Sequence, residues 1–430
     1  MMIERPIWVG MLDLDGDSAV VGVSGPMRPD HCQARVLIRI HQAPVGLVWV
    51  STLPQETLTA RVRMEAKTTL ADALYRHAER DTSAKEPNSA KTWAAQVACP
   101  RYFPTRSGEG VTVVICTKDR AESLRDCLRT LQEVDYDPLE IIVVDNASSG
   151  TATRDAVTAL ARDDPRILYV YEPRPGRTLA LNHGLARARF EIVAFTDDDT
   201  LVDPGWLSAI AAGFAADPAA VCVTGLVATS ALDTGSQRYF DARYPWGEVF
   251  QPRCFDLTVH RHPSRLYPFG AGIFGTGANC AVRRSAVTPI GGFDPLLGAG
   301  GPLRGGADLD LFLRLILAGG RICYLPSALI WHRHRDNTEA LAKQIYSYGH
   351  GLGAYLAKHL RNRDLRAALL AHGFRQAKVL LRRQRLATQA SQLGVGGRRL
   401  ALYEVWGVMP GAIRYWIVAR RASGSASGVR

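Results

Sequence analysis

The sequence lacks the paired cysteines that mark zinc ribbons and thioredoxin-like redox motifs. Its 430 residues contain eight cysteines, and none forms a CxxC pair. Several lie in apolar runs such as VVIC and RICY, where a free cysteine behaves as a small hydrophobe. We therefore expect unpaired thiols and a reducing compartment. The eight are Cys32, Cys99, Cys116, Cys127, Cys222, Cys254, Cys280 and Cys323.

Long apolar runs are also missing. No window of about 18 uncharged apolar residues occurs, so the sequence predicts no membrane span. The first residues, MMIERPIWVGMLDLDGDSAV, do not combine a basic region with a long apolar stretch, so no signal peptide is predicted. These two features predict a cytoplasmic protein.

No glycine-rich phosphate loop follows the first apolar strand of the central region, VTVVICT. Neither GxGxxG nor GxxxxGK[ST] occurs there, which argues against a Rossmann dehydrogenase and a P-loop ATPase. A nucleotidyltransferase would need a glycine- and lysine-rich pyrophosphate loop near the N-terminus, and the sequence has none there.

Positive charge is concentrated at the C-terminal end. The net charge is +11, and residues 333–430 contain 18 Lys+Arg and 4 Asp+Glu, a net of +14. The other 332 residues therefore carry 11 − 14 = −3. A basic region of this kind is a solvated helical surface or a contact for an anionic membrane, and no motif supports nucleic-acid binding.

Three regions follow from the hydrophobic pattern. Residues 1–105 are predicted to form a small β-rich domain, because ARVLIRIHQAPVGLVWVST alternates around a turn, followed by a helix in TTLADALYRHAERDT with Thr69 as its N-cap. Residues 111–335 alternate short apolar strands with amphipathic helices, which predicts an α/β fold with helices on both faces of the sheet. Residues 336–430 are rich in Leu, Ala and Arg and predict basic helices.

Polar residues follow three of the predicted strands. VTVVIC is followed by Thr117-Lys118-Asp119-Arg120, EIIVV by Asp145-Asn146, and IVAFT by Asp197-Asp198-Asp199. Ligands of open parallel sheets bind at the carboxyl ends of the strands, so we expect these side chains on one edge. Carboxylates are ligands for Mg²⁺ or Mn²⁺, which can bridge to the phosphates of a nucleotide.

Six segments in order resemble the family 2 glycosyltransferases, inverting enzymes of the GT-A fold that use nucleotide-sugar donors. They are VTVVICTKDRAESLRDCLRTL, LEIIVVDNASS, RPGRTLALNHGLARA, FTDDDT, GTGANCAVRRSAVTPIGGFDPLLG and GADLDLFLRLILAGGRICYLPSALIWHRHR. The resemblance covers roughly residues 111–335 and implies a Rossmann-like mixed sheet.

The resemblance also implies roles for single residues. Thr117, Asp119 and Asp145 would line the nucleotide pocket, with Asp145 accepting from a uracil-like imide of a UDP-sugar. Asp197 would face the ribose or the Mn²⁺ or Mg²⁺ ion, and the direct metal ligands would be Asp199 and His332, with His334 as the alternative to His332. Asp198 is expected to point to the other side of the sheet and to be dispensable.

Asp308 falls on the family's catalytic base, and Asp310 is the alternative acid. By the same resemblance, Asn279 would belong to a loop near the donor sugar. Ala307 replaces the family's glutamate before the base, which affects acceptor recognition. The family's ARN is ALN here, so Arg174 or Arg177 would serve the diphosphate.

Each assignment has a simpler alternative. The aspartates could cap helices or form turns, and Ala307 motivates a nucleotide-sugar binding protein without catalysis. The stretch YEVWGVMPGAIRYWIVARR holds aromatics flanked by arginines. This stretch is typical of an interfacial segment. The protein is therefore expected to be cytoplasmic, and the segment adds the possibility of a peripheral position on the inner face of the cell membrane. There it would meet a lipid-linked hydroxyl acceptor.

Overall fold

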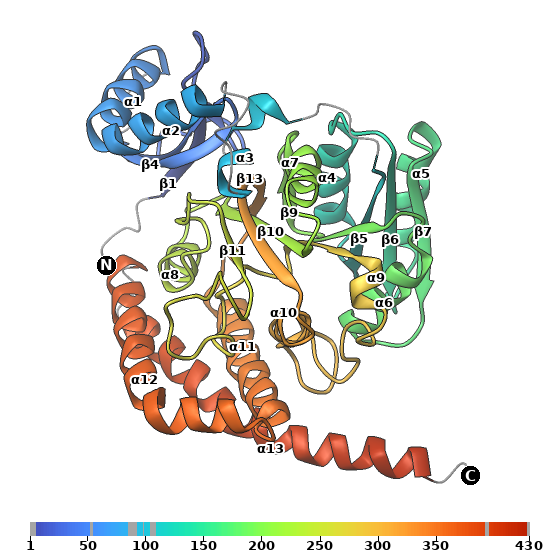
Figure 1. Cartoon of the computed structure of the whole chain (residues 1–430). Coiled ribbons are helices and arrows are strands. Elements are labelled where there is room, and N and C mark those ends of the chain that lie inside the picture. Colours follow the sequence, from blue (N-terminus) through green and yellow to red (C-terminus); the bar gives the residue numbers. More distant parts are fainter. Residues whose placement is uncertain are drawn as a thin grey trace.

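The computed structural model describes residues 6–51, 55–84, 93–97, 99–103, 109–391 and 395–427. Two β-sheets and a helical C-terminal region make up this part of the chain (Figure 1). The α/β fold class predicted from the sequence, with a mixed main sheet, a small N-terminal sheet and a helical end, is confirmed. The exact domain boundaries remain a prediction.

The small sheet has four strands in the order β2-β1-β3-β4. Strand β1 runs parallel to β3, and the other pairs are antiparallel. Two helices follow, and the predicted N-cap is wrong: Thr69 is the last residue of α1, and its hydroxyl donates to the Glu65 carbonyl. The elements are β1 (Ile7–Asp13), β2 (Val21–Gly22), β3 (Gln33–Ile40), β4 (Ala43–Ser51), α1 (Gln55–Thr69) and α2 (Ala71–Ala84).

Two buried ion pairs join the small sheet to the main unit. Arg35 of β3 donates to Asp241 at 2.6 Å, and Arg39 donates to Asp203 at 2.7 Å. Apolar side chains of β1 and β3, Val9 and Leu37, also belong to a core cluster of the main sheet. The two sheets therefore share part of one interior. Between them lie α3 (Trp93–Gln96) and the short 3₁₀ helix η1 (Pro100–Tyr102).

The main sheet runs in the order β11-β13-β10-β12-β8-β5-β6-β7, with β9 paired to β13. Pairs β8-β5, β5-β6, β6-β7 and β10-β13 are parallel, whereas β12 is antiparallel to both of its neighbours. The strands are β5 (Val111–Thr117), β6 (Leu139–Asn146), β7 (Ile167–Glu172), β8 (Ile192–Asp197), β9 (Thr200–Val202), β10 (Ala220–Thr229), β11 (Arg253–Phe255), β12 (Asn279–Arg283) and β13 (Arg321–His332).

Successive strand residues face opposite sides of this sheet and build two core layers. Val113 and Ile115 pack in one layer, whereas Val114 packs in the other. The first layer is covered by α4 (Ala121–Gln132), α5 (Ala152–Asp163) and α7 (Trp206–Ala215), and the second by α6 (Arg177–Arg187) and α10 (Ala307–Leu317). Continuous apolar strands are thus explained by burial on both faces. Two further helices are α8 (Gly235–Arg243) and α9 (Arg284–Val287).

Helices α11 (Thr338–His359), α12 (Arg363–Ser391) and α13 (Val395–Ser427) form the C-terminal region. Helices α11 and α13 pack backbone to backbone, because a Cβ on Gly349 would lie 1.9 Å from the Glu404 carbonyl oxygen and one on Gly411 would lie 2.0 Å from that of His350. Arg243 and Glu404 form a buried ion pair at 2.7 Å that fastens α13 to α8. Within the described ranges, no helix has both the length and the apolar character needed to cross a bilayer.

One cysteine expectation is wrong. Cys254 on β11 and Cys323 on β13 are directly opposite each other in the antiparallel register and form a disulfide. Six of the eight cysteines, Cys32, Cys99, Cys116, Cys127, Cys222 and Cys280, are free thiols. The spacing of 69 residues between the bonded pair hides it from a search for local motifs.

Candidate active site

Two carboxylates and one histidine meet at the end of the main sheet. Asp197 ends β8, Asp199 follows in the turn to β9, and His332 ends β13, where it is paired with Thr200 of β9. One side-chain donor atom from each of Asp197, Asp199 and His332 lies within 4.8 Å of the other two. The structure therefore brings together the three residues predicted as metal ligands, and this O,O,N donor set fits Mn²⁺ or Mg²⁺.

The two histidines of the WHRH segment have different positions. His332 Nε2 lies 3.3 Å from Asp199 Oδ1, while its Nδ1 lies 3.2 Å from His334 Nδ1. His334 is buried, its Nε2 lies 2.9 Å from the Thr229 hydroxyl, and burial lowers its pKa to about 3. The neutral His334 ring thus orients His332, which is the histidine that faces the carboxylates.

Asp198 belongs to the same cluster as its neighbours, contrary to the prediction that it points away. Its carboxylate accepts a 2.7 Å hydrogen bond from the Thr117 hydroxyl and a second from Arg120. Arg120 also donates to Asp199 at 2.8 Å, so this guanidinium bridges two of the three acids. Asp198 is 4% exposed, and its replacement would remove the acceptor of the Thr117 hydroxyl and one of the two carboxylates that Arg120 bridges.

Asp198 and Asp199 differ in protonation. Burial raises the pKa of Asp198 to about 7. Burial also opposes the charge of Asp199, but His332 and Arg120 together hold the pKa of that carboxyl well below its usual range. Asp199 is therefore the ionised member of this pair at neutral pH, as a metal ligand must be.

A buried acceptor lies at the end of β6. Asp145 is 1% exposed, and its Oδ2 accepts a 2.8 Å hydrogen bond from the Tyr169 hydroxyl. Its Oδ1 has no hydrogen-bond partner within the described ranges, although the atom is buried. An orphaned buried carboxylate oxygen is costly, which is the property expected of an atom awaiting a ligand N–H.

Asp119 builds the loop beside this position. It has a φ of 53°, and its Oδ1 accepts from the Ser149 amide at 2.8 Å and from the Ser149 hydroxyl at 3.0 Å. Its own amide donates to the Ser148 hydroxyl at 3.0 Å. Asp119 thus ties the loop after β5 to the loop after β6, next to Asp145.

The two candidate arginines have different surroundings in the structure. Arg174 forms a double contact with Glu172, at 2.8 and 2.9 Å, and leaves most of its side chain in solvent. Arg177, the first residue of α6, donates to Asp197 and lies 3.4 Å from the Gly277 carbonyl. Of these two arginines, Arg177 is the one that lies in the carboxylate cluster.

The two acids of α10 also have different surroundings. Asp308 is half-buried, and its Oδ2 accepts a 3.0 Å hydrogen bond from the Gly277 amide. A Cβ on Gly277 would lie 2.9 Å from that of Asp308, so glycine permits this approach. Asp310 is fully buried and paired with Arg314, Lys358 and His359. Asp308 is therefore the acid that remains next to Arg177 and the carboxylate cluster.

Asn279 has an interior position. Its amide donates to the carbonyls of Leu226 and Ala328, and its oxygen accepts from the Trp206 indole at 2.8 Å. With no exposed surface, this side chain cross-links β10, β13 and α7. Arg120, expected at this edge, and Tyr169, for which the sequence predicts no role, also contact site carboxylates that lie 24 to 79 residues away in the chain.

Residues 112–288 match the family described as Glycosyl transferase family 2. The chain is 29% identical over 279 residues to a pre-mycofactocin glycosyltransferase from Mycobacterium tuberculosis, covering 65% of this chain and 54% of the relative. It is 26% identical over 254 residues to an N-acetylglucosaminyltransferase from Mesorhizobium japonicum, covering 56% of this chain and 57% of the relative. The chain spans about half the length of these curated relatives.

Among solved structures, a mannosyltransferase from Pyrobaculum calidifontis in complex with GDP-Man and Mn²⁺ aligns with a TM-score of 0.47 and 22% identity. That alignment covers 80% of this chain and 93% of the other. The family match spans the strand ends that hold Thr117, Asp145 and Asp197, so the family resemblance predicted from the sequence is confirmed. Over residues 112–288, this chain is therefore similar to glycosyl transferase family 2.

Proposed function

We propose that this protein is an inverting, metal-dependent glycosyltransferase that moves a sugar from a nucleotide-diphosphate sugar to a hydroxyl acceptor. The observation that supports this most is the convergence of Asp197, Asp199 and His332 within 4.8 Å at the sheet edge where Asp145 and Asp308 also lie. When bound there, Mn²⁺ or Mg²⁺ supplies electrostatic stabilisation of the leaving diphosphate.

Each of the residues around this group has a different proposed role in binding the donor. Asp145 Oδ1 accepts from the imide N–H of the base, which favours a UDP-sugar donor. Asp119 holds the loop beside the nucleotide, with Thr117 fixing Asp198 behind it. Arg177 is the cation nearest to both Asp197 and the Gly277 loop, where the diphosphate would lie.

Asp308 takes the proton from the attacking hydroxyl. An acceptor hydroxyl has a high pKa and needs a base as it attacks the anomeric carbon. One base is sufficient for a single displacement, which inverts the configuration. The Gly277 amide holds the Asp308 Oδ2 and leaves this carboxylate half-buried at the edge.

The test of this assignment is Asp308→Asn. We expect transfer to fall by about 10²–10⁴-fold, since that is the usual contribution of a general base, while donor binding with Mn²⁺ is nearly unchanged. A thermal-shift screen of nucleotide-sugars first identifies the donor, and the same donor is then used for binding and transfer. Full transfer by the variant would contradict Asp308 as the base.

A nucleotide-sugar binding protein without catalysis is the second candidate. Ala307, which stands where the family has a glutamate, is 4% exposed and packs beside Gly298, so it offers no contact to an acceptor. Donor binding by the wild-type protein without transfer to any acceptor pool would favour this function.

We also propose that α13 docks the protein onto an anionic membrane surface, where a lipid-linked acceptor would be found. One stripe of this helix exposes large apolar side chains, with Trp406 at 61% and Met409 at 71% exposure. The stripe consists of Leu402, Val405, Trp406, Met409, Ile413, Trp416 and Ile417, and the exposed arginines beside it are Arg399, Arg414, Arg420 and Arg421. Apolar area and basic charge together are what an anionic interface binds.

Vesicle sedimentation tests this docking surface. Because α13 packs against α11 and α8, deletion of the tail would expose their interior, so we choose the double substitution Trp406→Ser and Met409→Ser. It should reduce binding to vesicles containing phosphatidylglycerol at least tenfold, and wild-type binding to phosphatidylcholine vesicles should be weak. Trp49→Ser, an exposed tryptophan on β4, is the matched control. Equal loss with the control would contradict a specific role for α13.

A further inference from the structure

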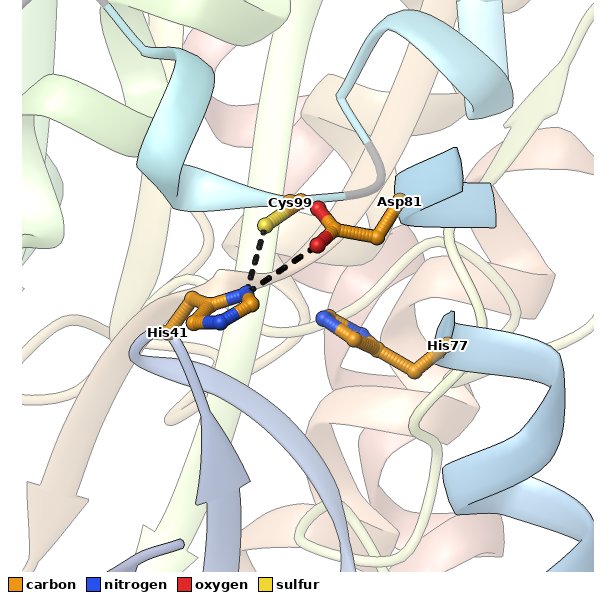
Figure 2. A group of neighbouring side chains, drawn as sticks. All are labelled: His41, His77, Asp81 and Cys99. Atoms are coloured by element: carbon orange, nitrogen blue, oxygen red, sulfur yellow. Dashed lines mark hydrogen bonds and ion pairs between the residues drawn. The ribbon is translucent and has the colours of Figure 1, made fainter. Parts of the chain in front are cut away.

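A second group of metal-ligand side chains lies outside the active site. His41 is in the turn between β3 and β4, His77 and Asp81 lie one turn apart on α2, and Cys99 immediately precedes η1. One donor atom from each of the four lies within 4.8 Å of the other three. Figure 2 shows their polar atoms directed toward a common point, although they come from three separate segments.

Two distances between the donor atoms are close to those of a four-ligand zinc site. His41 Nδ1 lies 3.2 Å from Cys99 Sγ and 3.9 Å from Asp81 Oδ2. Around a tetrahedral zinc with bonds of 2.0–2.3 Å, neighbouring ligand atoms are about 3.3–3.7 Å apart. Small side-chain rotations would therefore be sufficient to bring the donor atoms onto one ion.

The outer nitrogen of His41 is held by a carboxylate. Its Nε2 lies 3.2 Å from Asp15 Oδ1, and the Asp15 Oδ2 accepts from the His41 backbone amide. The ring therefore presents Nδ1 to the cluster. A histidine that donates its remote N–H to a carboxylate is the usual arrangement behind a metal, because it fixes the tautomer and strengthens the ligand.

His77 supplies the observation that points to a missing ligand. It is 3% exposed, and its buried Nε2 has no hydrogen-bond partner among the residues that the structure describes. Its ring stands 5.6 Å from that of His41 and is directed into the group (Figure 2). A buried ring nitrogen without a partner is costly, and a cation at the centre of the group would be that partner.

We propose that His41, His77, Asp81 and Cys99 bind a structural zinc ion. Two imidazoles, a thiolate and a carboxylate form a mixed N,N,S,O set that suits Zn²⁺ rather than Mg²⁺. The ion would join the β3–β4 turn, helix α2 and the segment before η1. These three segments are separated from one another in the sequence. Arg101 Nη1 lies 3.7 Å from Asp81 Oδ2 and is half exposed, so it can move away from the bound ion.

The test uses the full chain and measures bound zinc after exhaustive dialysis. We expect one equivalent of zinc in the wild-type protein and in Asp199→Asn, which removes the active-site ligand. Cys99→Ser and His77→Gln should lose that equivalent. Cys32→Ser, which removes a free thiol that lies just before β3 and outside the group, should keep it.

A cobalt spectrum gives a second readout that needs no variant. Co²⁺ added to the metal-free wild-type protein should produce a thiolate-to-cobalt charge-transfer band, because Cys99 is a ligand. The band should be present in Asp199→Asn and absent in Cys99→Ser. Less than stoichiometric zinc together with no thiolate band in the wild-type protein would overturn the site and leave a hydrogen-bonded polar cluster, even if Cys99→Ser failed to fold.

Discussion

The active-site group and the proposed zinc group of candidate metal ligands differ in composition and in exposure to solvent. The group at the edge of the main sheet offers two carboxylates and one imidazole, and Asp197 keeps 27% of its side chain exposed. The group between the small sheet and α2 offers four ligands of three kinds, and His77 and Cys99 in it are buried. Three ligands with an open side suit a reacting metal, whereas four protein ligands leave no position for substrate.

The surroundings of the two groups differ in the same way. Arg120, Arg177 and Arg335 approach the carboxylates of the first group and are suited to phosphate oxygens. Around the second group the neighbouring carboxylate, Asp15, instead holds a histidine ring in place. The proposed active-site group is therefore suited to exchange of ligands, and the proposed zinc group is suited to permanent binding.

The largest expected effect is on transfer activity, and a pair of variants distinguishes the two groups by it. Asp199→Asn removes a ligand of the active-site group, so transfer should fall roughly 100-fold or more because charge on the leaving diphosphate is no longer stabilised. Cys99→Ser should keep most of the transfer activity at a temperature where it is folded. Transfer measured with excess Mn²⁺ on both proteins checks this. Equal losses in the two variants would contradict the assigned division of roles.

A smaller effect is expected from the buried acceptor of the active site. Asp145→Ala removes the orphaned oxygen, and we expect the affinity for a UDP-sugar to fall about tenfold, which corresponds to about 1.4 kcal/mol. Calorimetric titration with Mn²⁺ present measures it. Tyr169→Phe, which removes only the hydroxyl that donates to Asp145 Oδ2, is the control and should change affinity much less. Unchanged affinity in Asp145→Ala would exclude the base contact.

The smallest effect on transfer is expected at Asp310, an acid whose partners are all supplied by the protein. Burial alone would raise its pKa, but His359, Arg314 and Lys358 hold the pKa at about 2. Because the unfolded carboxyl takes up its proton at higher pH, this stabilisation is present above about pH 4 and is lost as the pH falls toward 2. Asp310→Asn should therefore lower the free energy of unfolding at pH 7 by about 3–5 kcal/mol.

Denaturant unfolding at pH 7 and near pH 3 checks the sign. The difference in the free energy of unfolding between wild type and Asp310→Asn should be smaller at the lower pH. At that pH the wild-type protein loses part of the stabilisation that the ionised Asp310 provides. Transfer per folded molecule should be nearly unchanged, in contrast to Asp308→Asn. A gap that widens with falling pH would show that the carboxylate is not held by these cations.

The convergence of much of the candidate site could be predicted because its residues follow strands. Asp145, Asp197 and Asp199 come directly after apolar runs, and the ends of parallel strands meet at one edge. The orientation of a side chain at a strand end depends on partners that are distant in the chain. Asp198 was expected to point away, yet Thr117 and Arg120, 81 and 78 residues earlier, hold it inside the cluster. Asn279 was placed near the donor, and burial gives it interior partners instead.

The sequence by itself determined the order of strands and helices in the main unit, the acids at the strand ends and the basic C-terminal region. These features depend on local periodicity and on charge, which can be recognised from residues that are close together in the sequence. Only the tertiary structure decided that His332 rather than His334 faces Asp199, that Cys254 pairs with Cys323, and that four residues between 41 and 99 converge on one point. Those outcomes depend on strand register and packing between distant segments, because side-chain donors become neighbours only when the chain has folded.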